Sequence, residues 1–270
     1  MNNTPLYKDR FEQFKDIIKT HLSEVILCSI YVFLFTLPTI FWIFFTALTT
    51  FFSERHILNV LVINLGIMIT MPIMGLGFAG AFYVFKRLTF NDGTNVNSDF
   101  IVGIRKNGKS FAKIFFIIGA FYLLLHISLF NISIMNYSTN LLTILSALAY
   151  LLFFFLLFTM LFTCTQTILY SDTLKKFIRN GLLFTFGYLN KNIGVFIIML
   201  LPFIIYEFVP INNIKWMTIL ISGFFYFGFG TLLFTIYSNH IFDKTINIKQ
   251  FPQIYRKGLI KDENISNNTK

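Results

Sequence analysis

The chain has 270 residues, of which 56% are apolar, 13% are charged and 37 are Phe. The apolar share exceeds the roughly 45–50% of soluble domains, and the mean hydropathy is +0.69. This composition excludes a soluble globular domain. A bilayer core about 30 Å thick takes about 20 apolar residues per helical span, so the apolar residues suffice for six spans.

The formal charge of +10 would suit a nucleic-acid-binding protein, but its placement argues otherwise. The basic residues lie between long apolar blocks, so we expect the lipid bilayer as the partner and no nucleic acid. Cys28 and Cys164 both lie inside apolar blocks, which excludes a disulfide framework and a cysteine metal site. The first apolar block lacks a cleavage site, so we expect it to be retained as a span.

In chain order, we expect a cytoplasmic N-terminal tail over 1–24, a membrane domain over 25–242 and a cytoplasmic C-terminal tail over 243–270. The uncharged block 114–171 is too long for one span, because a helix of that length would reach about 87 Å. A polar cluster around Asn136 supplies the turn that divides it. The six predicted spans are 25–53, 57–85, 114–134, 141–170, 192–210 and 216–242.

Lys and Arg are distributed unevenly over the segments outside the spans. Of the 22, all but Arg55 and Lys215 lie in the two tails and in the segments 86–113 and 172–191. Basic residues in short loops resist translocation, so these segments are expected in the cytoplasm. The sequence therefore predicts an all-α, polytopic protein of the bacterial inner membrane, with six transmembrane helices and both termini cytoplasmic.

Each of the two basic cytoplasmic segments predicts a short amphipathic helix. Ser98 is the expected N-cap of the first, with apolar residues from Phe100 to Phe111 on one side, and the second repeats apolar residues from Leu174 to Leu182. Such helices are typical of the inner leaflet with its anionic lipids, and docking of a partner protein is the alternative. The expected membrane-surface residues are Lys86, Arg87, Arg105, Lys106, Lys109, Lys113, Lys175, Lys176 and Arg179.

Residues Gly103 to Ser110 match the phosphate-loop pattern G-x-x-x-x-G-K-[ST]. A working phosphate loop follows a strand, opens a helix and rests on a parallel sheet. The segment between two membrane helices has no room for that sheet. We therefore interpret Lys109 as an inner-leaflet anchor, keep a nucleotide-responsive protein as the weaker alternative, and predict no cofactor.

Three polar side chains lie inside predicted spans, namely Asn64, His126 and Gln166. Ionisable groups in a membrane are costly and often functional, but a neutral His also satisfies itself with one hydrogen bond. Two interpretations stay open, a structural role between helices and a path for a small solute or proton. The sequence contains no Ser/His/Asp, Cys/His, paired-carboxylate or metal-ligand constellation, so it does not predict an enzyme.

Small residues follow Pro72 in the second predicted span. Gly75 and Ala79 are four residues apart, as are Gly77 and Ala81. Small residues at this spacing let helix backbones approach closely. The pattern predicts tight packing of this span against a neighbour.

The second predicted span ends with a proline, a run of small residues, an aromatic residue followed by tyrosine, and a basic pair. An Asp-Phe pair and a basic segment that contains Asn follow this span. These features correspond to Pro72, Gly75 to Ala81, Phe82, Tyr83, Lys86, Arg87, Asp99, Phe100, Arg105, Lys106 and Asn107. With them, and with a second basic segment from Leu174 to Asn192, the chain resembles the YesL-like family of bacterial integral membrane proteins. The resemblance implies no catalytic or binding residue. Because members of that family are associated with carbohydrate-use genes, it implies an accessory role in sugar uptake or signalling.

These observations lead to one hypothesis and one alternative. The hypothesis is a non-enzymatic accessory or scaffold component of a transport or sensory system, partnered with another membrane transport or sensor protein. The alternative is a small-solute transporter with a path near His126, Asn64 and Gln166. The alternative requires these three side chains to line one cavity.

Overall fold

The structure, a computed structural model, describes residues 7–48, 57–135, 138–208, 217–218 and 220–260. In this part of the chain the regular structure is helical, apart from one isolated bridge between Tyr7 and Leu259. The all-helical class expected from the composition is confirmed for these residues.

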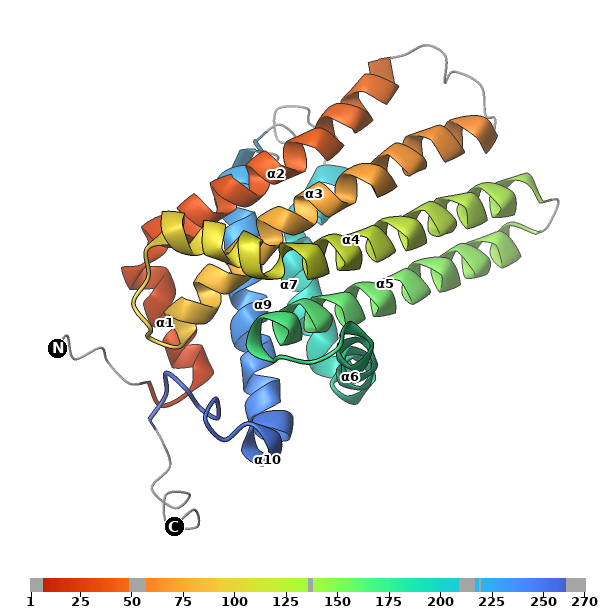
Figure 1. Ribbon diagram of the computed structural model, residues 1–270. Coiled ribbons are helices and arrows are strands. Elements are labelled where there is room, and N and C mark those ends of the chain that lie inside the picture. The colour runs from red at the N-terminus through yellow and green to blue at the C-terminus, as the bar shows by residue number, and fades with distance from the viewer. Residues whose placement is uncertain (1–6, 49–56, 136–137, 209–216, 219, 261–270) are drawn as a thin grey trace.

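Four long helices run side by side (Figure 1). Each is long and apolar enough to cross a membrane, and together they correspond to the first four predicted spans. The turn predicted around Asn136 lies between the last two, and Asn136 itself is outside the described residues. The four helices are α2 (Leu22–Leu48), α3 (Ile57–Thr89), α4 (Val96–Ile134) and α5 (Thr139–Leu169).

Helix α4 differs from the prediction, because the expected short helix and the third span form one continuous helix of 39 residues. The N-cap is Asn95 rather than Ser98, and the Ser98 backbone N–H donates to the Asn95 side chain over 3.3 Å. The segment contains no proline to stop the helix. At about 1.5 Å per residue α4 is about 58 Å long, roughly twice the hydrocarbon thickness, so a large part of it must extend beyond a bilayer.

The second half of the described chain has shorter helices. Helices α6 (Leu174–Gly187) and α7 (Leu189–Phe208) meet at a bend of 96°. If this bent pair is counted as one span, the described helices include five candidate spans instead of four. The separate helix expected in the second basic segment is thus present as α6. The predicted span 216–242 contains a π-helical turn, η2 (Ser222–Tyr226), which continues into α9 (Phe227–Phe242).

The segments predicted as tails are folded where the structure describes them. Helix α1 (Arg10–Thr20) starts at Asp9, whose carboxylate accepts from two backbone N–H groups of the first turn at 2.8 Å each. After α9 the chain forms the π-helical turn η3 (Asp243–Asn247) and the short α10 (Ile248–Gln250). Buried polar contacts, described below, hold both segments against the bundle.

Small residues set the spacing of α3 from its two neighbours. A Cβ on Gly75 would lie 2.9 Å from a backbone oxygen of α4, and a Cβ on Gly77 would lie 2.8 Å from a Phe side chain of α2. Ala79 and Ala81 are both fully buried. Positions two apart on a helix point about 200° apart, so the two small pairs serve different neighbours.

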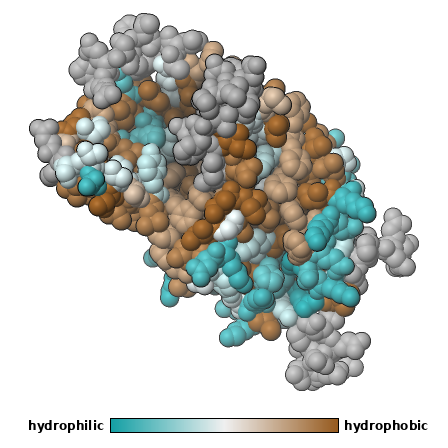
Figure 2. All heavy atoms as spheres, turned by 180° about the vertical axis from the view of Figure 1, so that it is seen from behind, coloured by the Kyte–Doolittle hydropathy of each residue, from teal (hydrophilic) through white to brown (hydrophobic). Residues whose placement is uncertain are grey.

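The basic segments meet at one end of the bundle. The Gln13 side chain of α1 donates to the carbonyl of Thr89 at the end of α3 (2.7 Å), and Lys86 donates to the carbonyl of Ile168 near the end of α5 (2.8 Å). Figure 2 shows a broad hydrophobic surface, with hydrophilic side chains gathered most densely at one end. The segments that the charge distribution assigns to one side of a membrane therefore lie together.

Candidate functional site

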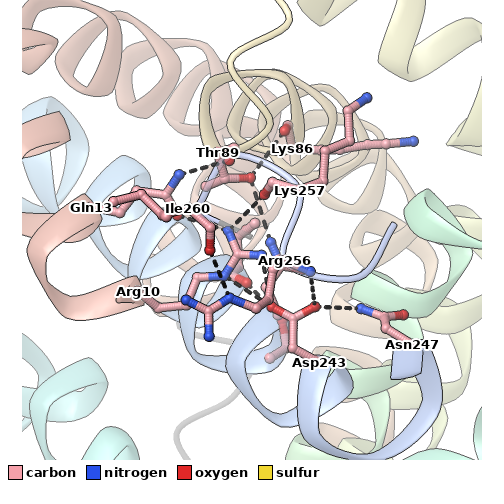
Figure 3. Close-up of polar contacts among 12 residues, drawn as sticks. Arg10, Gln13, Lys86, Thr89, Asp243, Asn247, Arg256, Lys257 and Ile260 are labelled. Atoms are coloured by element: carbon pink, nitrogen blue, oxygen red, sulfur yellow. Dashed lines mark hydrogen bonds and ion pairs between the residues drawn. The ribbon is translucent and has the colours of Figure 1, made fainter. Parts of the chain in front are cut away.

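A buried ion pair joins the two ends of the described chain (Figure 3). The Arg10 guanidinium donates from Nη2 to Asp243 Oδ2 over 2.8 Å and from Nε to the same oxygen over 3.2 Å. Arg10 is only 4% exposed and Asp243 only 7%. Because buried charges are stable only when they are paired and hydrogen-bonded, this contact holds α1 against the end of α9.

Further donors and acceptors complete this network. Asp243 Oδ1 accepts from Asn247 Nδ2 over 2.8 Å and from the backbone N–H of Arg256 over 3.1 Å. Arg10 Nη1 donates to Gln13 Oε1 and to the carbonyl of Lys257 at 2.9 and 3.1 Å. Burial lowers the pKa of Arg10, and the neighbouring Asp243 carboxylate opposes that shift. The network therefore connects α1 to η3 and to the turn that contains Arg256 and Lys257.

The nine basic residues predicted to face the membrane surface divide into two groups. In the first group the side chains have internal contacts: Lys86 donates to a carbonyl of α5, Arg87 pairs with the buried carboxylate of Asp99, and Lys176 pairs with Asp172. Lys106 lies 5.6 Å from the centre of the Tyr83 ring. These four contribute to the fold.

The second group consists of side chains that are exposed and have no ion pair or hydrogen bond with any other described residue. On α4 these are Arg105, Lys109 and Lys113, which recur every four residues and so form one stripe along the helix. On α6 they are Lys175 and Arg179. This free basic surface, defined by these five residues, is available to an external anion.

Each of the three polar side chains of the predicted spans has its own contact, and no recorded hydrogen bond joins one of the three to another. Asn64 donates to the carbonyl of Val60 in its own helix over 2.7 Å. The His126 ring packs against that of Tyr122, with the centroids 4.2 Å apart and the ring planes inclined by 52°. Gln166 is fully buried and bridges α5 to α6 through the carbonyl of Phe177 at 3.2 Å.

The structure also describes two pockets. The larger has a volume of about 240 Å³ and lies between α3, α4, α5, α7 and the η2–α9 segment. The smaller, of about 10 Å³, lies beside Lys86. Asn64, His126 and Gln166 line neither of these two pockets.

The phosphate-loop pattern lies inside the first half of α4. Its backbone N–H groups are therefore in the helix interior, where they donate to carbonyls four residues earlier and cannot surround a phosphate. Gly103 is needed for packing instead, because a Cβ there would lie 2.8 Å from the carbonyl oxygen of Ala79 on α3. The motif is a packing feature, and the nucleotide alternative loses its geometric basis.

Sequence reasoning missed Arg10 and Asp243. They lie 233 positions apart, and each looks like an ordinary charge beside an apolar block. It also missed the larger pocket, since no local pattern marks residues that converge from five elements. Among the described residues, no three or more His, Cys, Asp and Glu side chains are grouped to hold a metal ion.

Comparisons with known proteins complete this description. A scan against protein-family models found no match, and neither did searches of curated proteins and of solved structures. The resemblance to the YesL-like family stays a prediction from the residues quoted for it. The chain is therefore interpreted from its own geometry.

Proposed function

We propose that the protein crosses the inner membrane six times with both termini in the cytoplasm. We further propose that it serves as a non-enzymatic accessory or scaffold component of a transport or sensory system. The family resemblance adds a link to carbohydrate use. The free basic surface on α4 and α6 supports this proposal most directly, because these cations are exposed and have no partner among the described residues, whereas neighbouring cations do.

Two properties of the surface favour contact with anionic lipid headgroups and with an acidic face of a membrane partner. The α4 stripe precedes the apolar part of α4, so it lies where that helix leaves the hydrocarbon in the proposed orientation. Basic side chains near an anionic leaflet contribute about 1 kcal/mol each. A rigid helix also presents the three charges at fixed spacing, which suits recognition of a partner.

The test compares two triple variants of the full chain that remove the same charge. Arg105→Ala, Lys109→Ala and Lys113→Ala remove the α4 stripe, while Lys191→Ala, Lys244→Ala and Lys249→Ala remove three exposed lysines elsewhere. We expect phosphatidylglycerol to raise the unfolding temperature of the wild-type protein and of the control in detergent, and to raise that of the stripe variant much less.

Partner capture uses the same variants in native membranes. We expect a membrane protein that cross-links to the wild type and to the control but not to the stripe variant. Equal capture by all three proteins would contradict a role of the stripe in docking. Reporter fusions at Asn95 and Asn136 on the same side of the membrane would contradict the topology.

A further inference from the structure

The larger pocket is built from apolar side chains that belong to different helices. Met71 and Met74 come from α3 and Met199 from α7, and Phe227 closes the side formed by α9. Methionine side chains are flexible and polarisable, so they adapt to ligands of irregular shape. The volume of about 240 Å³ exceeds the about 150 Å³ of an apolar cavity that stays dry and binds benzene.

Most hydroxyl groups in the lining are already satisfied by their own helix. Ser222 donates to the carbonyl of Thr218 and Thr231 to that of Phe227, both over 2.7 Å. Tyr226 is different, because its hydroxyl is buried and has no hydrogen-bond partner. The Tyr226 hydroxyl is itself not accessible, so the walls of the pocket are almost entirely hydrocarbon, whereas a buried water needs two to four polar partners.

Gly230 keeps the pocket open. In the described helices, a Cβ on any other buried glycine would lie 3.0 Å or less from a neighbouring atom. At Gly228, for example, it would lie 2.2 Å from the carbonyl oxygen of Val25. A Cβ on Gly230 would meet nothing nearer than Met199 Cε at 3.8 Å. Close helix packing thus explains the other glycines but not Gly230, whose missing side chain leaves empty volume.

The adjacent π-helical turn contributes to the same opening. Turns of this kind are widened single insertions that often occur at functional sites. The turn at Ser222–Tyr226 is supported by Ser29 of α2, whose hydroxyl donates to the carbonyl of Gly223 over 2.9 Å. This contact fixes the segment that carries Tyr226.

The level of the pocket along α4 indicates which molecule reaches it. Phe115 and Ile118 line it, and they follow Lys113, the last basic residue before the apolar half of α4. In the proposed orientation this level is the boundary between headgroups and hydrocarbon of the inner leaflet. At that boundary the acyl chain of a lipid begins.

We propose that this pocket binds the acyl chain of an inner-leaflet lipid. The choice of leaflet rests on the proposed orientation. Binding of a lipid in the pocket does not depend on the accessory role. A negative result in partner capture therefore leaves the lipid proposal standing, and a negative result in lipid binding leaves the accessory role standing.

The test is photo-cross-linking of the full chain in vesicles of phosphatidylethanolamine and phosphatidylglycerol with a trace of phospholipid that carries a diazirine on its acyl chain. We expect adducts on Met71, Met74 or Met199 that are competed by unlabelled phosphatidylglycerol. Leu148 and Leu152, exposed on α5, report contact with bulk lipid, which does not saturate. The proposal would be overturned if the pocket residues are not labelled. It would also be overturned if unlabelled phosphatidylglycerol lowers their labelling no more than it lowers that of the α5 residues.

Variants add a second, matched comparison. Gly230→Leu fills the pocket and is expected to lower its labelling about tenfold. Gly194→Leu makes the same change on α7, where a Cβ meets nothing within 4 Å, and is expected to leave labelling unchanged. Equal labelling in both variants would overturn the assignment. If Gly230→Leu does not fold, the competition experiment on the wild type still decides.

Discussion

Arg10 and Lys109 both belong to segments that the charge distribution assigns to the cytoplasm, but their environments are opposite. Arg10 is buried and its guanidinium donates four hydrogen bonds, two of them to Asp243, whereas Lys109 is exposed and has no partner among the described residues. A count of Lys and Arg in the segments assigned to the cytoplasm therefore combines two kinds of residue. Some cations stabilise the fold, and only the others remain available to lipids or partners.

The largest expected effect comes from breaking the buried pair. Arg10→Ala leaves the Asp243 carboxylate buried without its cation, which costs about 3–5 kcal/mol of unfolding free energy. Thermal unfolding in detergent measures the loss, and Lys19→Ala, which removes an exposed charge from the same helix, is the control. A loss as small as that of Lys19→Ala would show that the network does not hold the chain ends together.

A smaller effect is expected in the turn that supports this network. Gly258 and Gly93 both have positive φ, at 84° and 67°, but only a Cβ on Gly258 would collide, 2.1 Å from the carbonyl oxygen of Thr89. Both substitutions to Ala cost about 1–2 kcal/mol from the left-handed backbone, and Gly258→Ala adds about 1–3 kcal/mol from overpacking. Equal unfolding temperatures for the two variants would contradict the close contact.

A pH dependence is expected at Tyr7, whose hydroxyl donates to Asp16 over 2.7 Å. Burial and the nearby carboxylate raise the pKa of Tyr7 from 10.0 to about 12. A raised pKa in the folded state means that its contribution to stability is complete below pH 10 and is lost as the pH rises towards 12. Unfolding temperatures of the wild type and Tyr7→Phe should therefore converge over that range, and a constant difference would contradict the shift.

The smallest effect on stability is expected from the free basic surface. Lys109→Ala should change the unfolding free energy by less than about 0.5 kcal/mol, because an exposed side chain without a partner contributes little. Equilibrium binding of labelled ATP should be equally absent in the wild type and in the variant. Specific binding that depends on Lys109 would restore the nucleotide hypothesis, which the helical backbone of α4 disfavours.

Local chemistry made a large part of the fold predictable. Long uncharged blocks predicted α2, α3 and α5, and the apolar repeat from Leu174 predicted α6, since each pattern depends on neighbouring residues alone. The continuity of α4 was not predictable in this way. Gly103 and Gly108 look like interruptions, but packing against α3 stabilises the helix through them.

By itself, the sequence determined the helical class, the apolar blocks and the unequal distribution of basic residues, because hydrophobicity and charge act residue by residue. Only the tertiary structure decided which cations have partners in the fold and which contacts Asn64, His126 and Gln166 make. It alone revealed a pocket bounded by Gly230 and Tyr226. These features arise from contacts between segments far apart in the chain, and no local pattern encodes which distant side chain will provide a partner or leave a space.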